Sequence, residues 1–407
     1  PDTGRWAVIA TLAGRLDDAR PRVDGFELTD SGKRRVFRRI AGAAWHEVSG
    51  SIPASEGAAP VWSPRIEEGL NEPPDVYAKG PAGEMVRLTT LNPQFNVKTW
   101  GTVKPYTWRD AKNRQWQGGL LEGEGTVGRS KLPLVIQAYA FSSNRFFLDG
   151  PNTWYGGPSA FAGRAFAREG VLVLMMGFRP MSGPVSDDYK KLRQFNEGVR
   201  GAVNALVKAG RVDPARVGII GWSTTGETVL NLLTFSDLPI RAATLADGDA
   251  NSLFAYTVTY GINVWDHMEA MNNAAPFGPK LADWVRNDPA LNTDCVRSAL
   301  RIESYGVPMY NNYDIYTLLR RQYKPVEMIL IPGGTHSLSK PSERMVSLQG
   351  NVDWFRFWLK GERRTAPMLA GETAVSLQAQ YEAWQQMEAM KAKVDAVPRC
   401  SRAASLG

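Results

Sequence analysis

The residue of this sequence that best fits a catalytic role is a serine that lies between a predicted strand and a predicted helix. Residues 217–220 are apolar, as in a buried strand, and the hexapeptide 221–226 (GWSTTG) separates them from a helical run. A sharp turn here would lift the Ser223 hydroxyl above a sheet and point the Thr224 amide at a developing oxyanion. Thr225 stands where a second glycine is usual in this motif. We predict that Ser223 is a nucleophile rather than a helix-capping serine, and that Thr224 contributes to an oxyanion hole.

A serine nucleophile needs a base within hydrogen-bond distance, and the chain has three histidines. His336 follows an apolar run, 326–331, through the residues Pro-Gly-Gly-Thr. A histidine on the loop after the last strand fits the chain order serine, acid, histidine of α/β-hydrolases. We therefore predict that His336 is the base. His46, in a region of short strands, and His267, in a segment rich in Asn, Met and Asp, are expected to be structural or surface residues.

The third member of such a triad is a carboxylate that orients the histidine. It usually follows the strand before the histidine strand, which here is the run 299–302. Glu303 is the only carboxylate at that strand end, so we predict that Glu303 is the acid. The alternative is that Glu303 forms a salt bridge with Arg301 or Arg297.

Three aspartates are further candidates for the acid. Asp314 is the second choice, although it could instead cap a helix over 315–320. Asp249 is the third choice, because some hydrolases take their acid from the strand that corresponds to 242–246. Asp247 is a weaker candidate than Asp249.

The pattern of the chain divides it into three regions. Residues 106–364 alternate apolar strand-like runs with helical patterns, which predicts an α/β-hydrolase catalytic domain with a mostly parallel sheet. Residues 1–105 contain short apolar runs between turn residues, and a similar tryptophan-containing phrase occurs at 1–8 and 61–65. We interpret this region as the C-terminal blades of a β-propeller. Residues 365–407 are predicted to form a helical C-terminal tail.

The propeller region is too short to close on itself. A blade needs about 40–50 residues, so only about two blades fit before residue 106. An incomplete ring would leave bare strand edges. We therefore expect further propeller upstream, and an association of this chain with that missing N-terminal segment.

Composition limits the classes of ligand. The net charge is +7, but the basic residues are scattered, so we expect no nucleic-acid partner. Cys295 and Cys400 are the only cysteines, too few for a metal cluster, and they could be paired or free. The chemistry predicted above needs neither a metal nor another cofactor. No apolar run reaches 18 residues, so we expect no membrane span.

The start of the chain leaves its compartment open. Residues 1–6 lack an initiator methionine and do not resemble a signal peptide, so the chain as given could be processed or truncated. Cytoplasm and periplasm both remain compatible with two cysteines.

Three segments together resemble the prolyl oligopeptidase family of serine peptidases. They are the nucleophile region 212–223, the histidine region 325–336 and the closing helix 351–359. In that family a tyrosine after the first strand of the hydrolase domain donates to the oxyanion. The resemblance points to Tyr139 in the run 137–141 for this role, although the usual Tyr-Gly-Gly is absent.

Within the family, the chain is similar to the lasso peptide isopeptidases. The features that suggest this are a glutamate near the position of the acid and the closing segment 351–359 (NVDWFRFWL). This resemblance implies a peptide substrate, namely a threaded lasso peptide, whose ring-closing isopeptide bond is hydrolysed through an acyl-enzyme on Ser223.

Two further hypotheses remain open at this point. The chain could hydrolyse linear oligopeptides, as dipeptidyl peptidases of the family do, although residues 1–105 show no convincing pair of glutamates to hold a free N-terminus. It could also be a binding protein whose catalytic site has decayed. A triad does not separate an isopeptidase from a peptidase, because both carry out acyl transfer from an amide.

Overall fold

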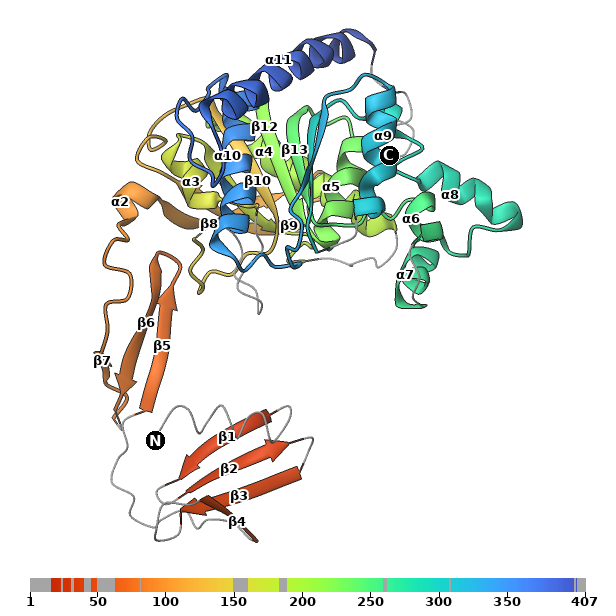
Figure 1. Ribbon diagram of the computed structural model, residues 1–407. Coiled ribbons are helices and arrows are strands. Elements are labelled where there is room, and N and C mark those ends of the chain that lie inside the picture. Colours follow the sequence, from red (N-terminus) through yellow and green to blue (C-terminus); the bar gives the residue numbers. More distant parts are fainter. Residues whose placement is uncertain are drawn as a thin grey trace. The chain divides into compact units, whose positions relative to one another are not determined.

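The computed structural model describes residues 16–22, 25–30, 33–39, 45–49, 63–80, 82–148, 160–182, 189–258, 262–306, 309–398 and 400. The chain forms two compact units, one of residues 1–67 with 75–90 and the other of residues 68–74 with 91–407. The boundary expected after residue 105 falls inside a strand of the larger unit, β8 (Thr102–Arg109) (Figure 1). The predicted tail also belongs to that larger unit.

The N-terminal strands form two small antiparallel sheets. Strands β1 (Leu16–Arg22), β2 (Gly25–Asp30), β3 (Lys33–Arg39) and β4 (Trp45–Val48) pair in chain order, and β5 (Ser63–Gly69), β6 (Glu72–Lys79) and β7 (Met85–Arg87) form a second sheet. A four-stranded antiparallel meander is the architecture of a propeller blade, so these strands are consistent with part of a propeller. Of the repeated phrase at 1–8 and 61–65, only residues 63–65 lie within the described part of the chain.

The larger unit contains an eight-stranded sheet with the order β15-β14-β13-β12-β10-β11-β9-β8. Six of these strands are parallel, and β8 and β9 are an antiparallel pair at one edge. The predicted α/β class with a mostly parallel sheet is therefore confirmed. The strands after β8 are β9 (Gln115–Glu122), β10 (Leu132–Tyr139), β11 (Leu172–Gly177), β12 (Val212–Trp222), β13 (Ile240–Ala246), β14 (Ala299–Ser304) and β15 (Val326–Leu330).

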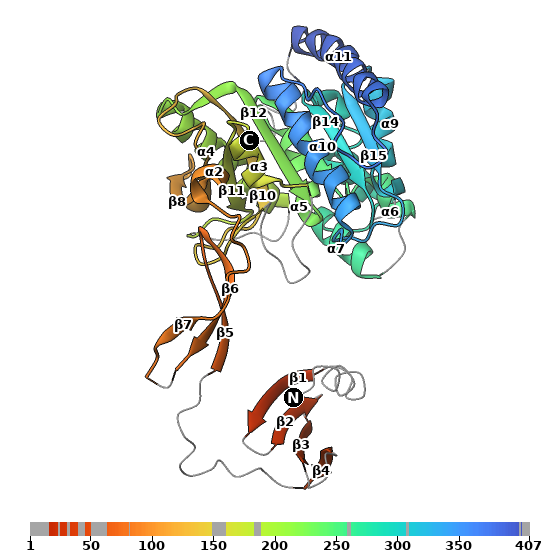
Figure 2. The same ribbon diagram turned by 60° about the vertical axis from the view of Figure 1, so that its left-hand side comes forward.

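Helices cover both faces of the sheet because successive strand residues point to opposite sides. Leu134 and Ile136 belong to one core with helices α4 (Tyr189–Lys208), α5 (Thr224–Phe235) and α9 (Tyr313–Arg321). Val135, between them, belongs to a second core with α3 (Gly163–Arg168) and α10 (Pro341–Lys360). Figure 2 shows α10 lying across the sheet near β14 and β15.

The predicted C-terminal helix is present as α11 (Ala374–Ala396), and a capping box between Thr373 and Ser376 begins it. Its apolar stripe faces the core beside α10 through Leu377, Tyr381, Trp384 and Met387. Cys400, beyond the helix, is paired with Cys295 in a disulfide. The tail is therefore a docked part of the larger unit.

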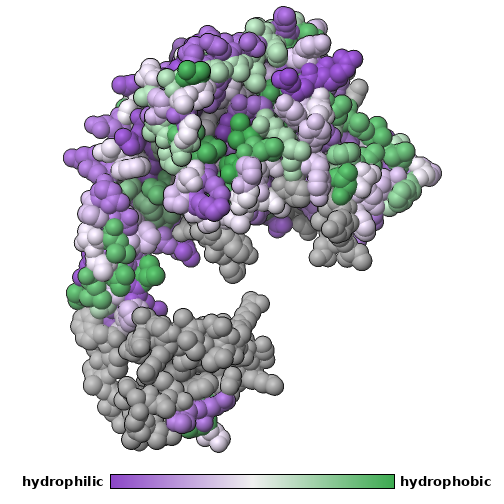
Figure 3. Space-filling view, viewed as in Figure 1, coloured by the Kyte–Doolittle hydropathy of each residue, from purple (hydrophilic) through white to green (hydrophobic). Residues whose placement is uncertain are grey.

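Short helices occupy the connections around the sheet. Helices α6 (Leu253–Val258), α7 (Ile262–Asn272) and α8 (Leu281–Asn287) lie between β13 and β14, and Figure 3 shows apolar side chains gathered over this part. In the described part of the chain, the remaining helices are α2 (Val97–Trp100) and the 3₁₀ turns η1 (Gly278–Lys280), η2 (Thr293–Cys295) and η3 (Met309–Asn312). Among the described residues, no helix is both long and apolar enough to cross a membrane.

Candidate active site

Ser223 lies on a sharp turn between the central strand β12 and helix α5. Its backbone has φ 57° and ψ −133°, a conformation that is strained for a residue with a Cβ atom. Two backbone hydrogen bonds hold it there, from the Ser223 amide to the Ala246 carbonyl (3.1 Å) and from the Gly226 amide to the Ser223 carbonyl (2.8 Å). The serine thus stands at the carboxyl edge of the sheet, on the predicted strand–turn–helix.

The tight turn depends on small residues on both of its sides. A Cβ atom on Gly248 would lie 2.5 Å from the Ser223 carbonyl oxygen, and one on Gly221 would overlap the Thr225 carbonyl. Thr225 is buried, and its hydroxyl accepts from the Trp222 amide (2.9 Å) and donates to the Trp222 carbonyl (2.8 Å). Threonine therefore fits where glycine is usual, because its side chain bonds back to the strand end.

His336 lies beside Ser223, on the loop between β15 and α10. Its Nε2 is 2.8 Å from Ser223 Oγ, within the reach that a general base needs. The imidazole ring stacks on the indole of Trp222 with a centroid separation of 4.3 Å and an interplanar angle of 23°. The structure thus brings together the two residues that the sequence paired as nucleophile and base.

The carboxylate that contacts His336 belongs to Asp247, directly after β13. Its Oδ2 is 2.6 Å from His336 Nδ1, and its Oδ1 accepts from the backbone amides of Tyr305 (2.7 Å) and Gly306 (2.8 Å). The side chain is fully buried. A Cβ atom on Gly306 would come within 2.9 Å of Asp247 Oδ2 and 2.5 Å of His336 Cα, so the imidazole and carboxylate meet only because residue 306 is glycine.

The prediction that Glu303 is the acid is wrong in this structure. Glu303 is fully buried, accepts hydrogen bonds from Arg301 Nε (2.9 Å), Asn351 Nδ2 (2.7 Å) and the Ser347 hydroxyl, and makes no contact with His336. Burial raises the pKa of Glu303, and the Arg301 guanidinium opposes this effect. The physical reason is strand alternation, since the side chain of residue 303 points toward α10 and away from the loop that carries His336.

The other two aspartates that were considered also have different partners. Asp249 accepts from the side-chain amide of Asn311, and burial raises its pKa. Asp314 lies in the first turn of α9, where it accepts from the Ile315 amide (2.8 Å), and burial raises its pKa to about 6. Neither carboxylate forms a hydrogen bond with the imidazole of His336.

The other two histidines lie apart from this constellation. His46 is exposed on β4. His267, on α7, has its Nε2 3.7 Å from Glu227 Oε2 and its side chain is nearly half exposed. Neither contacts Ser223 or Asp247 among the interactions of the described residues.

The two predicted oxyanion donors lie at the same edge of the sheet as Ser223. Tyr139 ends β10, which pairs in parallel with β12 so that Ala138 lies opposite Gly221. The Tyr139 ring is half-buried and packs edge-on against Trp222 at 5.3 Å. Thr224 is the first residue of α5, where free amides and the positive end of the helix dipole favour negative charge.

Sequence reasoning ranked Asp247 last among the candidate acids, and it missed Gly306 and the role of Trp222 as a shared contact. The signal for Asp247 was the order Ala246-Asp247-Gly248 at the end of an apolar strand, because the first residue past a strand can turn into the site at the carboxyl edge. The signal for Gly306 was weaker, since nothing local demands a glycine there. A glycine is required at position 306 because the loop that carries His336 approaches its backbone closely.

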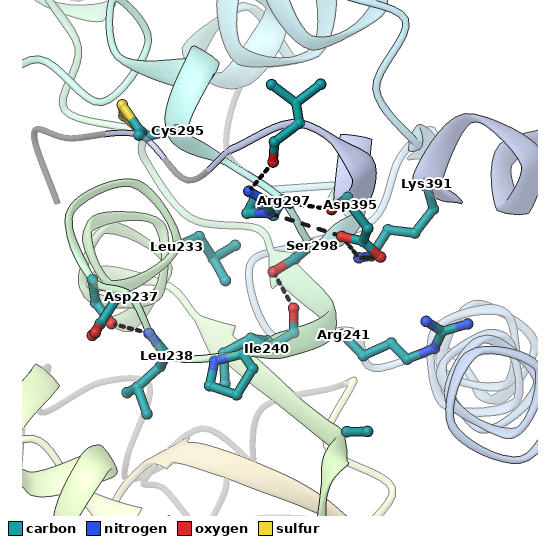
Figure 4. Close-up of a pocket in the computed structure, with 15 residues that line it drawn as sticks. Leu233, Asp237, Leu238, Ile240, Arg241, Cys295, Arg297, Ser298, Lys391 and Asp395 are labelled. Atoms are coloured by element: carbon teal, nitrogen blue, oxygen red, sulfur yellow. Dashed lines mark hydrogen bonds and ion pairs between the residues drawn. A yellow bond between two sulfur atoms is a disulfide. The ribbon is translucent and has the colours of Figure 1, made fainter. Parts of the chain in front are cut away.

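A pocket of about 460 Å³ lies elsewhere, between the start of β13 and the end of α11. Figure 4 shows Arg297 and Lys391 directed toward Asp395 within it. Its lining includes Cys295 and Cys400, whose sulfurs are joined and so cannot act as thiolate ligands beside Asp294. None of the residues around Ser223 lines this pocket, so it is separate from the candidate active site.

The fold and the site together define a class. A mostly parallel sheet, a strained serine on a strand–helix turn, and a serine–histidine–aspartate chain of hydrogen bonds are the features of an α/β-hydrolase. Residues 190–362 of the chain match the model of the prolyl oligopeptidase family.

Comparison with known proteins gives the same placement. A lasso peptide isopeptidase, AtxE2 of Asticcacaulis excentricus, is 26% identical over 320 residues, which are 77% of this chain and 44% of that protein. The structure of AtxE2 isopeptidase with astexin3-dC4 bound superposes with a TM-score of 0.65 at 20% identity, covering 93% of this chain and 59% of the other.

More distant peptidases share the fold. The acylaminoacyl peptidase of Pyrococcus horikoshii has a TM-score of 0.60 at 17% identity, over 89% of this chain and 58% of that one. A puromycin-hydrolysing peptidase of Mycobacterium tuberculosis has a TM-score of 0.56 at 16% identity, over 84% and 53%. The chain thus spans between two fifths and three fifths of the length of these relatives.

Proposed function

We propose that the protein is a serine peptidase that hydrolyses the isopeptide bond closing the ring of a lasso peptide. The hydrogen-bonded chain from Ser223 through His336 to Asp247 is the observation that supports amide hydrolysis. The likeness to a lasso peptide isopeptidase over 77% of the chain supports the substrate class.

The proposed first half-reaction forms an acyl-enzyme. Ser223 Oγ attacks the carbonyl carbon of the isopeptide bond while its proton passes to His336 Nε2. The Asp247 carboxylate holds the imidazole through Nδ1 and stabilises the cation that forms. Two backbone amides fix that carboxylate, so little reorganisation is needed when charge develops.

The proposed oxyanion hole consists of the Thr224 amide and the Tyr139 hydroxyl. When the tetrahedral intermediate collapses, His336 gives its proton to the leaving amine and the C–N bond breaks. Water then attacks the acyl carbon, again losing its proton to Nε2, and the carboxylic acid leaves Ser223. The ring of the lasso peptide is thereby opened, and its mass rises by that of one water molecule.

The test is mass spectrometry of the protein mixed with a threaded lasso peptide or with the unthreaded linear form. We expect the lasso peptide to gain one water and the linear form to remain intact. The Ser223→Ala variant is the control, because it should bind the lasso peptide without opening it. Cleavage of the linear peptide alone would contradict the proposal and identify an oligopeptide hydrolase.

A further inference from the structure

Trp222 lies where the parts of the candidate site meet. It is the last residue of β12, directly before Ser223, and is 2% exposed. One aromatic system contacts the imidazole of His336 (4.3 Å, 23° between planes) and the ring of Tyr139 (5.3 Å, 61° between planes). A single side chain therefore touches both the proposed base and a proposed oxyanion donor.

The backbone of Trp222 is held firmly, which fixes where its ring can lie. Its amide and carbonyl both bond to the Thr225 hydroxyl, and it pairs with Ala246 of β13. The ring in turn limits the imidazole, because a stacked face at 4.3 Å leaves no room for His336 to swing toward the strand. The position of the base is thus tied to the same turn that carries the nucleophile.

The loop after β14 orients the acid. Burial and the charges of Glu303 and Asp247 raise the pKa of the Tyr305 hydroxyl well above its ordinary value. The backbone amide of Tyr305 donates to Asp247 (2.7 Å). The ring contacts of Trp222 are therefore those with His336 and Tyr139.

We propose that Trp222 is a positioning residue for this triad: its indole face holds the His336 ring between Ser223 and Asp247 and stabilises the imidazolium that forms during attack. When the serine proton moves to Nε2, one positive charge appears on a ring stacked against the face of a tryptophan. The quadrupole of tryptophan attracts a cation in that place. This inference rests on the proposed triad and does not depend on which peptide is cleaved.

Other ionisable groups also act on His336, and the test must leave them unchanged. Asp247 bonds to it directly, and Asp249 interacts with it electrostatically from the same loop. Glu227 acts on Asp249 from α5, and Tyr305 lies on the loop after β14. Variants at position 222 replace none of these groups, and both Trp222→Leu and Trp222→Phe lack the indole N–H, so a difference in pH dependence between them would report the aromatic face.

The rate of Ser223 labelling by a fluorophosphonate probe, measured against pH, tests the proposal without any peptide substrate. We expect Trp222→Leu to label at least about tenfold more slowly. The acid limb of its profile, meaning the pH range over which the labelling rate rises, should move to lower pH by about half a unit, because the imidazolium loses its aromatic partner. Trp222→Phe keeps an aromatic face and should recover most of the rate and of the limb position. The matched control is Trp384→Leu, a buried tryptophan on α11, which should leave the limb unchanged.

A second measurement covers the case in which Trp222→Leu does not fold. Replacing tryptophan by fluorinated tryptophan withdraws electron density from the ring face with little change in shape. On fluorination, the acid limb should move to lower pH in the parent protein and should not move in the Trp222→Phe variant. The other 12 of the 13 tryptophans are fluorinated in both proteins, so the comparison isolates position 222. An unmoved limb in the fluorinated parent, or in a folded Trp222→Leu variant, would overturn the proposal.

The labelling experiment distinguishes a failure of the Trp222 proposal from a failure of the proposed isopeptidase function. A protein that labels at Ser223 with the expected pH shifts but leaves lasso peptides intact would support Trp222 and remove the isopeptidase assignment. A parent protein that does not label at all would overturn both, because the triad itself would then be inactive.

Discussion

The backbone amide of Asp247 donates to the carbonyl of Glu303 at 2.8 Å, so two buried carboxylic residues lie side by side on neighbouring strand ends. Their side chains point in different directions. Asp247 reaches His336, and Glu303 reaches Arg301 and Asn351. Adjacent positions at one edge of the sheet therefore serve different purposes, one in the site and the other in the core.

This relationship predicts opposite effects for two similar substitutions. Asp247→Asn should lower kcat by about 10³–10⁴-fold, because the imidazole loses its correct tautomer and the stabilisation of its cation. Glu303→Gln should retain most of the turnover but lower the melting temperature, because Arg301 would lose a buried ionic partner. Kinetics and thermal melting of both variants check this. Loss of turnover in a Glu303→Gln protein of unchanged stability would return Glu303 to the triad.

A second prediction concerns the close approach at Gly306. The added methyl group of Gly306→Ala would meet Asp247 Oδ2 and the backbone of His336, so the base should shift and kcat should fall by about 100-fold. Gly177→Ala is the matched control, since a Cβ atom there meets nothing within 4 Å. Steady-state kinetics with the same substrate separate the two variants, and equal rates would show that the loop accommodates a side chain.

A third prediction concerns Thr225, which replaces the usual glycine of the turn. Thr225→Val keeps the shape but removes both hydrogen bonds to the buried Trp222 backbone, so we expect a loss of about 1–3 kcal/mol in the free energy of unfolding and slower labelling of Ser223. Thr225→Ser keeps the hydroxyl and should behave like the parent. Denaturant unfolding measures the first effect, and indistinguishable Val and Ser variants would argue against it.

A fourth prediction is a pH dependence of stability at the C-terminal helix. The Arg364 guanidinium holds the pKa of Glu372 at about 2, below its ordinary value of 4.5. A lowered pKa in the folded state means that the stabilisation is present above about pH 4.5 and is lost as the pH falls toward 2. Glu372→Gln should therefore show a shallower decline in unfolding free energy over this window. Parallel declines for parent and variant would refute the role of this pair.

A fifth prediction follows from the bridge between Cys295 and Cys400, which closes a loop of 105 residues. Reduction, or Cys400→Ser, should lower the free energy of unfolding by about 2–4 kcal/mol, because the unfolded chain is no longer restrained. Labelling of Ser223 should remain, since neither cysteine contacts Ser223, His336 or Asp247. Melting with and without reductant provides the measurement, and an unchanged melting temperature would count against the bridge.

The sequence predicted the α/β class well because the strands and helices carry strong local patterns. The apolar run 171–176 corresponds to β11, and the helical spacing from Phe195 to Leu206 falls inside α4. Ser223 and His336 could be predicted because Ser223 follows strand β12 directly and His336 lies on the loop after the last strand, β15, so that local order carries the information. Their side chains lie within hydrogen-bond distance of each other.

The acid could not be found in the same way. The choice between Asp247 and Glu303 depends on which way two side chains turn at neighbouring strand ends, and strand register decides this across the 55 residues of chain between them. The register pairs Ala246 with Glu303, and a shift by one residue would exchange the two faces. Single-sequence patterns do not specify such a long-range relationship.

Two residues of the proposed triad share an unusual backbone, since φ is 57° at Ser223 and 45° at Asp247. Each such residue costs of the order of 1–3 kcal/mol relative to a relaxed conformation. Glycine would remove that strain at either position, at the expense of the reacting group. A search for variants that only resist heat would therefore be expected to recover glycine at these two positions. Substitution at these two positions would then raise thermal resistance and lower catalysis at the same time.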